Sequence, residues 1–276
     1  MSTRLLHLQA SLLEYLTSAA AIFGDRPVSP DHDLHGVDSG RLRLEARFSF
    51  DKRLAKISSV FPRAFAIFAG DWAPVLREFV DAQPPMDIGR LSNAQQFFDF
   101  LSRRFDNAHM EPAWLLDVAA CELACAQVRA HAKVGEPAIA DTVPGAVRCR
   151  PGAVLLRCTH DVRSVFEDRA GDSAGVKRPT LLVVFIPPHV DRVQICDVGH
   201  EVFDLLSACP QWTDPTTLGL AGGSDEFVSD LAARGLLEVR YGRKDLQSLA
   251  NFRRADTAQP ATKPNRQGSR RGSSGR

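Results

Sequence analysis

Residues 180–186 have the sequence TLLVVFI, the most strand-like run in the chain. Branched and aromatic side chains of this kind favour the extended backbone of a β-strand. A PPH turn follows at residues 187–189, and a second run, RVQIC, occupies residues 192–196. We expect these two runs to pair, and the rest of the C-terminal half is predicted around them.

Strand signals also precede this pair. Residues 146–149 and 154–156 are largely apolar and flank Arg150-Pro151-Gly152, a sequence typical of a turn, so they predict a hairpin. After the pair we expect helices at about 198–208, 215–220 and 224–235, and a last strand at 236–241. Strands followed by short helices and a terminal strand predict a small α+β domain of winged-helix type over residues 146–242.

The first 133 residues show helical periodicity. Leucines at spacings of three and four predict an amphipathic helix over residues 3–20. A second helix is expected at 41–59, ending before Phe61-Pro62, because the residue before a proline avoids helical angles. Later helices are expected to begin at Asp71, Ser92 and Glu111-Pro112, the last of them reaching His131. We therefore predict an irregular helical bundle over residues 1–133 and a linker over residues 134–145.

The composition is that of a globular protein. The chain has 276 residues, of which 44% are hydrophobic, enough for two domains without disulfides or metal. No apolar run approaches the roughly 20 residues that a membrane-spanning helix needs, so no membrane contact is expected. The six cysteines include no CxxC pair, which is typical of free thiols in a reducing cytosol. We expect a cytoplasmic protein.

The net charge of +1 hides an uneven distribution. Residues 240–276 hold ten Lys and Arg against two Asp, so residues 1–239 carry −7. Gln, Ser, Gly, Pro and Arg dominate from residue 243 onward, and this composition predicts a disordered basic tail over residues 243–276. Such a tail could bind nucleic acid without specificity, although a terminal charge run is more often a solvated segment.

The acidic charge of the C-terminal helices bears on DNA binding. Residues 198–236 carry six acidic residues and one base, Arg234. A helix that enters the major groove relies on Lys and Arg against phosphate, so specific DNA binding is not expected here. A winged-helix transcriptional regulator remains the alternative function, and a sequence-specific electrophoretic shift would support it.

The sequence offers no catalytic constellation. It contains no GxSxG, Walker A or HExxH motif. Asp117 and Glu122 are five positions apart on one predicted helix and do not share a face, so they do not predict an acid–base pair. The run DHDLH at residues 31–35 lies in a proline-rich loop with nothing to preorganise a metal site. We expect neither catalysis nor a bound cofactor or metal in this chain.

A protein without catalytic residues can recognise a peptide by adding it as a strand to an exposed sheet edge. The strands predicted at 181–186 and 191–196, together with the helix at 224–235, suggest such an edge beside an apolar groove. The candidate groove residues are Val183, Phe185, Val193, Ile195, Phe227 and Leu231. The competing interpretation is that these side chains fill the core of the small domain.

Four motifs follow one another along the chain. They are LLHLQ at residues 5–9, VFPRAFAIFAG at 60–70 with Asp71-Trp72, Phe79 and Pro84-Pro85 after it, PAWLLDVAACE at 112–122, and VRCRPGAVLL at 147–156. In order and spacing they resemble the HvfC-like family, whose N-terminal helical domain has been labelled DNA-binding. The resemblance covers most of residues 4–240. It departs from the family at residues 45–48, EARF, where a Tyr-Arg pair is usual, and this leaves the subfamily and the modification open.

The resemblance implies a non-catalytic partner of a multinuclear non-haem iron oxidative enzyme that modifies cysteines in ribosomally made peptides. The methanobactin and thiaglutamate pathways use such pairs. It further implies a heterodimer with a barrel-type oxidase that holds the iron, and a winged-helix domain that binds the leader of the precursor peptide as an added strand. The candidates for docking the oxidase lie in or near the family-like motifs: Phe61, Pro62, Trp72, Trp114, Asp117 and Glu122.

Overall fold

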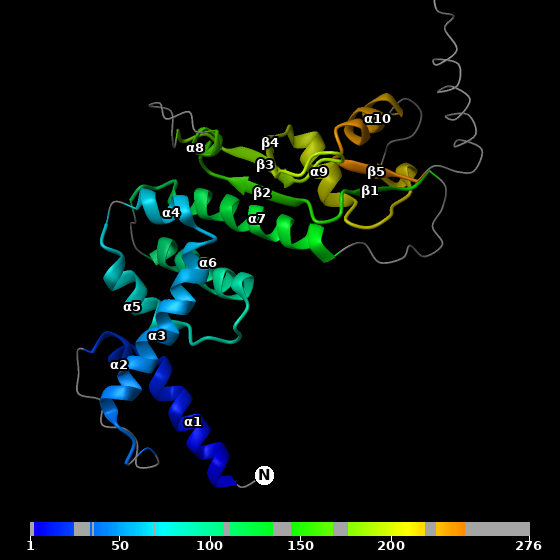
Figure 1. Cartoon of the computed structure of the whole chain (residues 1–276). Helices are drawn as coiled ribbons and strands as arrows, with labels where there is room; N and C mark the ends of the chain where they lie inside the picture. Colours follow the sequence, from blue (N-terminus) through cyan, green and yellow to red (C-terminus); the bar gives the residue numbers. More distant parts are fainter. Residues whose placement is uncertain are drawn as a thin grey trace, which may run out of the picture.

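The computed structural model describes residues 3–24, 34, 36–68, 70–107, 111–134, 145–167, 176–218 and 225–240. It combines helices with small antiparallel sheets, as the α+β prediction requires (Figure 1). The N-terminal half is helical: α1 (Thr3–Thr17), α2 (Ala19–Phe23), α3 (Ser39–Ser58), α4 (Pro62–Ile67), α5 (Trp72–Ala82), α6 (Arg90–Asn107) and α7 (Leu115–Val134). The C-terminal half contains β1 (Val147–Cys149), β2 (Val154–Cys158), α8 (Arg163–Phe166), β3 (Thr180–Phe185), β4 (Gln194–Asp197), α9 (His200–Ala208), η2 (Pro215–Leu218), α10 (Asp225–Ala233) and β5 (Leu237–Val239).

Short polar side chains set several helix starts. The Asp71 side chain accepts a hydrogen bond from the N–H of Ala73 at 2.8 Å, so Asp71 caps α5 as the sequence predicts. Ser18 divides the single helix predicted over residues 3–20 into two. Its backbone is extended, and its hydroxyl accepts from the N–H of Ala21, which starts α2 afresh.

The last helix of the bundle begins later than predicted. The N–H of Leu115 donates to the carbonyl of Pro112, which forms a turn, and α7 follows at Leu115. By contrast, α3 ends at Ser58 and Pro62 opens α4, in agreement with the boundary expected at Phe61-Pro62.

The C-terminal strands form two separate sheets. The pairing of the runs around 180–186 and 192–196 is confirmed: β3 pairs antiparallel with β4, and Val183 lies opposite Cys196. The other side of β3 pairs with β2, giving the order β2-β3-β4, while β1 pairs with β5 in a second sheet. Figure 1 shows β1 and β5 beside the end of the larger sheet.

The hairpin predicted between residues 146–149 and 154–156 is wrong. The chain does turn at Gly152, which has a φ of 77°, and the N–H of Ala153 closes the turn on the carbonyl of Arg150. However, the N–H of Arg150 donates to the carbonyl of Leu236, so the residues before the turn stay with β5. The turn therefore carries the chain from one sheet to the other.

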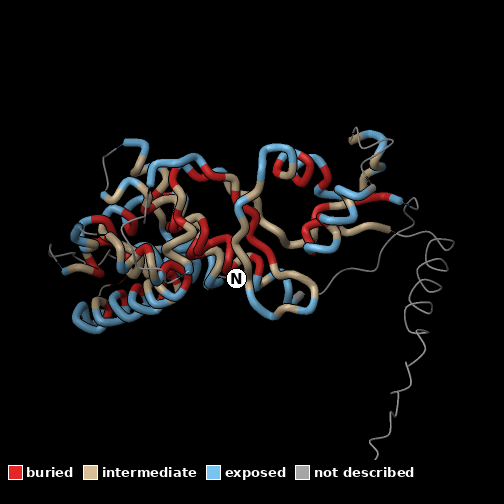
Figure 2. The backbone as a smooth tube through the Cα atoms, turned by 90° about the horizontal axis from the view of Figure 1, so that it is seen from above, coloured by how far each residue is buried: buried red, intermediate tan, exposed pale blue. Residues whose placement is uncertain are grey.

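Helix α7 contributes to the core on both of its sides. Leu115, Ala119 and Leu123 pack into the core of the helical bundle. Other α7 residues pack against the β2-β3-β4 sheet: Val118 and Cys121 in one cluster with Leu182, and Ala124 and Val128 in another with Val184. Both of these sides of α7 are therefore covered: Figure 1 shows α7 between α6 and β2, and Figure 2 shows buried segments in both halves of the molecule.

The opposite face of the same sheet is also covered. Val183 and Phe185 of β3 belong to a cluster with Leu205 and Leu206 of α9 and Leu231 of α10. Because side chains alternate along a strand, Leu182 and Val184 face α7 while Val183 and Phe185 face the C-terminal helices. The sheet is therefore the central layer of the C-terminal half.

Some sequence predictions fall outside the described residues. These are most of the loop at 25–33, the linker at 135–144, Ser224, and the basic tail at 243–276.

Candidate functional site

The outer edge of β4 is unpaired among the residues that the structure describes. The N–H of Val198 donates to the carbonyl of Leu181, so in this antiparallel register Cys196 and Gln194 also bond to β3. The backbone N–H and C=O groups of Ile195 and Asp197 consequently face away from β3. No other described strand lies on that side of β4. This edge can accept one more strand through main-chain hydrogen bonds.

The six predicted groove residues divide into three environments. Val183, Phe185 and Leu231 are buried in the cluster under α9 and α10, where they fill the core. Val193 and Ile195 are half-buried on the opposite face of the sheet, beside Val184 and residues of α7. Phe227 is 37% exposed on α10. The structure thus brings five of the six to the two faces of one sheet and leaves Phe227 at the surface.

One partly open side chain, Cys196, marks the edge on its α10 side. Cys196 is the least buried of the six cysteines and packs partly against the cluster that contains Leu231. Burial raises the pKa of its thiol, and the positive charges of Arg163 and Arg234 oppose that shift. Cys196 therefore lies within the electrostatic reach of two arginines, one near α8 and one after α10.

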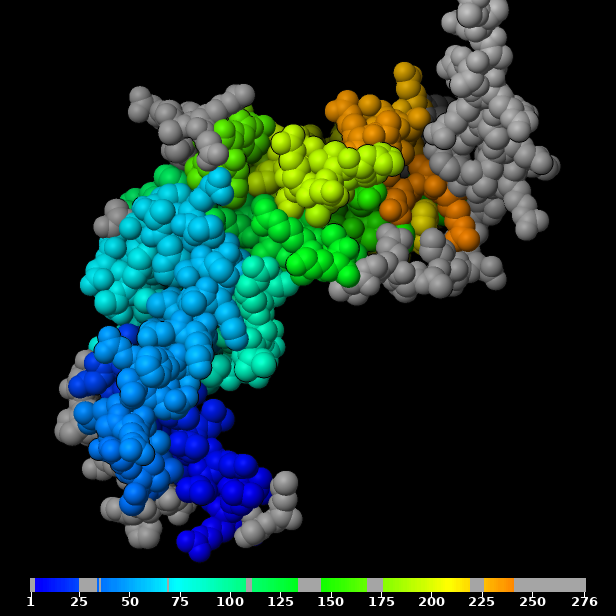
Figure 3. All heavy atoms as spheres, viewed as in Figure 1, coloured from blue at the N-terminus to red at the C-terminus, as the bar shows by residue number. Residues whose placement is uncertain are grey.

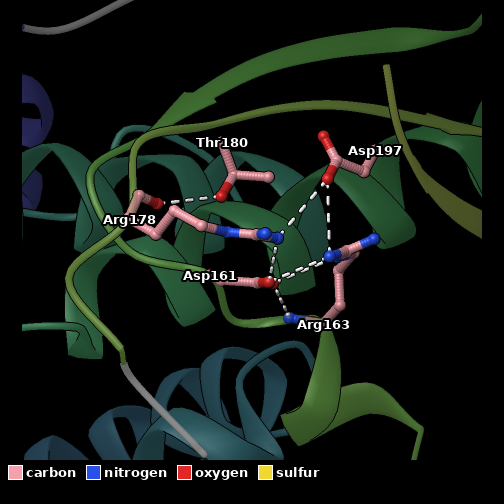
Figure 4. Close-up of polar contacts among 5 residues, drawn as sticks. All are labelled: Asp161, Arg163, Arg178, Thr180 and Asp197. Atoms are coloured by element: carbon pink, nitrogen blue, oxygen red, sulfur yellow. Dashed lines mark hydrogen bonds and ion pairs between the residues drawn. The ribbon is translucent and has the colours of Figure 1, made fainter. Parts of the chain in front are cut away.

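A network of two arginines and two aspartates holds one end of this edge (Figure 4). The Arg163 guanidinium donates to both carboxylate oxygens of Asp161, at 3.0 and 2.9 Å. Arg178 also donates to Asp161, and both arginines pair with Asp197, at 3.4 and 3.5 Å. The hydroxyl of Thr180 donates to the carbonyl of Arg178, at the start of β3. The network ties the last residue of β4 to Arg178, two residues before β3, and to Asp161 and Arg163 in the segment after β2.

The two arginines and the two aspartates of this network balance in charge, and their contacts shift the pKa of Asp161. The hydrogen bond from Arg163 is the main reason that the pKa of Asp161 falls to about 2, with further help from the charge of Arg178. The Arg163 pKa is raised by the same contact. The network is therefore an anchor for the sheet edge, since its two positive charges already face two carboxylates.

The predicted docking residues are not one surface. Phe61 is fully buried in the helical core. Glu122 is 5% exposed, and its carboxylate accepts from the N–H groups of Arg63 and Ala64 at 2.8 and 3.0 Å, which caps the first turn of α4. Pro62 is exposed, whereas Trp72 and Trp114 are half-buried. Only the last three offer surface to a partner.

Asp117 has a structural role that the sequence did not reveal. Its carboxylate accepts from the N–H groups of Thr159 and His160 and from the Thr159 hydroxyl. Nδ1 of His160 lies 2.9 Å from Oδ2 of Asp117 and 2.8 Å from the same hydroxyl. In a nucleophilic triad the carboxylate and the hydroxyl contact opposite ring nitrogens, so this trio does not have that geometry. No spacing between residues 117 and 160 could have signalled it.

The described residues include no group of three or more His, Cys, Asp or Glu side chains placed to hold a metal ion. Over the same residues, no helix combines the length and the apolar composition needed to cross a bilayer. No protein-family model matches the chain. A search of curated proteins also returned no match.

Proposed function

We propose that this chain is a non-catalytic recognition subunit that binds the leader of a precursor peptide and presents it to an iron-dependent oxidase of barrel type, in RiPP biosynthesis. The iron would belong to the oxidase. The observation that carries the proposal is the unpaired outer edge of β4, where the backbone groups of Ile195 and Asp197 face outward.

Three features near this edge support a peptide as the ligand. Strand addition supplies affinity through the backbone and specificity through neighbouring side chains. Cys196 of β4 provides partly open surface on the α10 side of the edge. The network of two arginines and two aspartates holds one end of β4 in place. Strand binding there therefore costs little conformational entropy.

The element order favours a winged-helix type of domain for this role. The paired strands β2, β3 and β4 precede helices α9 and α10, and β5 ends the domain. The motifs that resemble the HvfC-like family lie partly on α4 and α7, and α7 connects the bundle to the sheet. We propose that the oxidase docks on the exposed parts of this region, including Pro62, Trp72 and Trp114.

A proline substitution tests the edge directly. Ile195→Pro removes an outward N–H without touching the β3–β4 hydrogen bonds, whereas Ile195→Ala keeps the N–H and removes more of the side chain than proline does. The probe is a short cysteine-bearing precursor peptide, taken from a gene beside this one where such a gene is found, with its leader labelled for fluorescence anisotropy. We expect Ile195→Pro to weaken binding at least about tenfold, the loss of one or two main-chain hydrogen bonds, and Ile195→Ala to weaken it far less. Equal affinities for both variants would contradict strand addition at β4.

Co-expression tests the partner. A barrel-type iron oxidase encoded beside this gene, co-expressed with this chain, should elute from a sizing column with it as a heterodimer, with iron in the oxidase fraction after separation. A chain that modifies the precursor by itself would overturn the proposal.

A further inference from the structure

A cavity lies in the helical bundle, far from the sheet edge. It has a volume of about 250 Å³, is partly open to solvent, and is lined by residues of α1, α2, α3, α5, α6 and the segment between α5 and α6. Figure 3 shows α1 and α3 at the end of the molecule away from the C-terminal half. An apolar cavity of roughly 150 Å³ can hold benzene, so this volume suits a ligand of about ten non-hydrogen atoms.

The wall of the cavity is mainly apolar. Leu16 comes from α1, Ile22 from α2, Phe50 from α3 and Val80 from α5. Ile88, in the segment between α5 and α6, also lines the cavity and is itself 87% exposed. An apolar ligand that covers the exposed Ile88 side chain would remove apolar surface from water, which is favourable.

The polar groups around the cavity are mostly cationic. Lys52, Arg53 and Lys56 lie on one side of α3, and Asp87 is the single acidic residue in the lining. Asp87 is already engaged: a hydrogen bond from Ser92, a hydrogen bond from the N–H of Gly89 and the nearby charge of Lys56 all lower its pKa. The lining therefore has an excess of positive charge.

The three cations are not equally available. The Arg53 guanidinium donates to Asn93, to the carbonyl of Gln83 and to Gln96, so it belongs to the scaffold. The ammonium of Lys56 donates to the carbonyl of Ile88 at 2.7 Å and keeps two further N–H donors. Lys52, one helical turn earlier, makes no hydrogen bond or ion pair with any residue of the described part of the chain. Two ammonium groups can thus face one anion at the cavity.

We propose that this cavity binds a small amphipathic carboxylate, whose aliphatic body fills the apolar interior while its carboxylate pairs with Lys52 and Lys56. A single carboxylate suits the two ammonium groups of Lys52 and Lys56. The Arg53 guanidinium, which could otherwise form a bidentate pair with it, already donates its hydrogen bonds within the protein. The site is separate from the peptide-binding edge and stands whether or not the proposed function is correct.

Octanoate and octanol are a matched pair of probes for the full-length protein. They share the same alkyl chain, and only octanoate carries a charge. We expect octanoate to bind in the millimolar range, as is typical of ligands of about ten atoms, and octanol to bind several-fold more weakly. Methyl chemical shifts of Leu16, Ile22 and Ile88 report occupancy of the cavity.

Substitutions in the cavity lining separate the contribution of the lysine charges to octanoate binding from the contribution of the apolar contacts. Lys52→Met and Lys56→Met should each weaken octanoate binding by about two- to fivefold and leave octanol almost unchanged, the size expected for a partly exposed ion pair. Lys133→Met, an exposed lysine on α7 outside the cavity, should change neither affinity. Ser49→Trp adds a large ring to the lining and should weaken both probes more than tenfold.

Three results would overturn this assignment. One is the absence of octanoate-dependent shifts at these methyl groups at millimolar concentration. Another is equal affinity for octanoate and octanol in a wild-type protein whose thermal unfolding is normal. The third is unchanged octanoate affinity in the Lys52→Met and Lys56→Met double variant.

Discussion

Oδ2 of Asp117, on α7, lies 2.9 Å from Nδ1 of His160, two residues after the end of β2. The same carboxylate also accepts from the backbone N–H groups of Thr159 and His160. It therefore fastens the last helix of the bundle to the sheet through polar contacts, beside the apolar cluster of Val118, Cys121 and Cys158. Breaking this contact should loosen the connection between the two halves of the chain.

Asp117→Ala should lower the free energy of unfolding by about 2–3 kcal/mol, because it leaves several partly buried donors without an acceptor. Urea denaturation followed by tryptophan fluorescence measures this loss. Asp51→Ala, at an exposed position on α3, is the control and should cost less than about 0.5 kcal/mol. An equal loss in both variants would mean that the Asp117 contacts add nothing to stability.

Glu122→Gln tests the buried cap of α4. The carboxylate accepts from two backbone N–H groups, and the amide can accept from only one of them without placing its own NH₂ against the other donor. We expect a loss of about 1–3 kcal/mol in a urea titration, the usual cost of leaving a buried donor unsatisfied. A stability equal to that of the wild type would show that the N–H groups of Arg63 and Ala64 are satisfied without Glu122.

Asp161→Asn should change how stability depends on pH. The pKa of Asp161 is about 2 in the folded chain against an ordinary value of 3.8, so the unfolded chain binds the proton first as the pH falls. The stabilisation is therefore complete above about pH 4–5 and is lost as the pH falls toward 2. The urea midpoints of wild type and variant should converge over that range, and a constant difference would contradict the pairing with Arg163. Asp204→Asn, 66% exposed, is the control.

Cysteine labelling should single out Cys196. The other five thiols are buried, whereas Cys196 is half-exposed on β4. Mass spectrometry after brief treatment with iodoacetamide should find Cys196 modified first, although more slowly than a free thiol because burial raises its pKa. Cys196→Ser should remove this fast phase. If a peptide adds to the edge of β4, saturating peptide should slow the reaction, and early labelling of Cys121 would contradict the described packing.

Gly152→Ala should destabilise the connection between the two sheets. Gly152 has a φ of 77°, and a Cβ atom there would collide with the ring of His131 at the end of α7. We expect a loss of about 1–3 kcal/mol in thermal or urea unfolding. The double variant with His131→Ala should recover the part due to the collision and retain the part due to the backbone angle. If the double variant is no more stable than Gly152→Ala alone, the whole loss of stability comes from the strained backbone angle.

The sequence predicted the local elements well where the cause is local. Three correct predictions depend on residues that are close together in the chain. They are the cap at Asp71, the end of α3 before Pro62, and the pairing of the runs at 180–186 and 192–196. The break at Ser18 was missed because a serine inside a leucine pattern can point outward or cap a new helix, and the leucine spacing does not distinguish these.

Tertiary structure alone decided the partners of β1 and β2, which sides of α7 are covered, and which groove candidates are buried. The turn at Gly152 was visible in the sequence, but the strands beside it joined different sheets: Cys149 pairs with Leu237 of β5, and Val154 pairs with Val184 of β3. Val183 and Phe227 have equally apolar side chains, yet one is fully buried and the other open. Hydrogen bonds and steric preferences within a few residues can be predicted from the sequence, whereas burial depends on segments that meet only after folding.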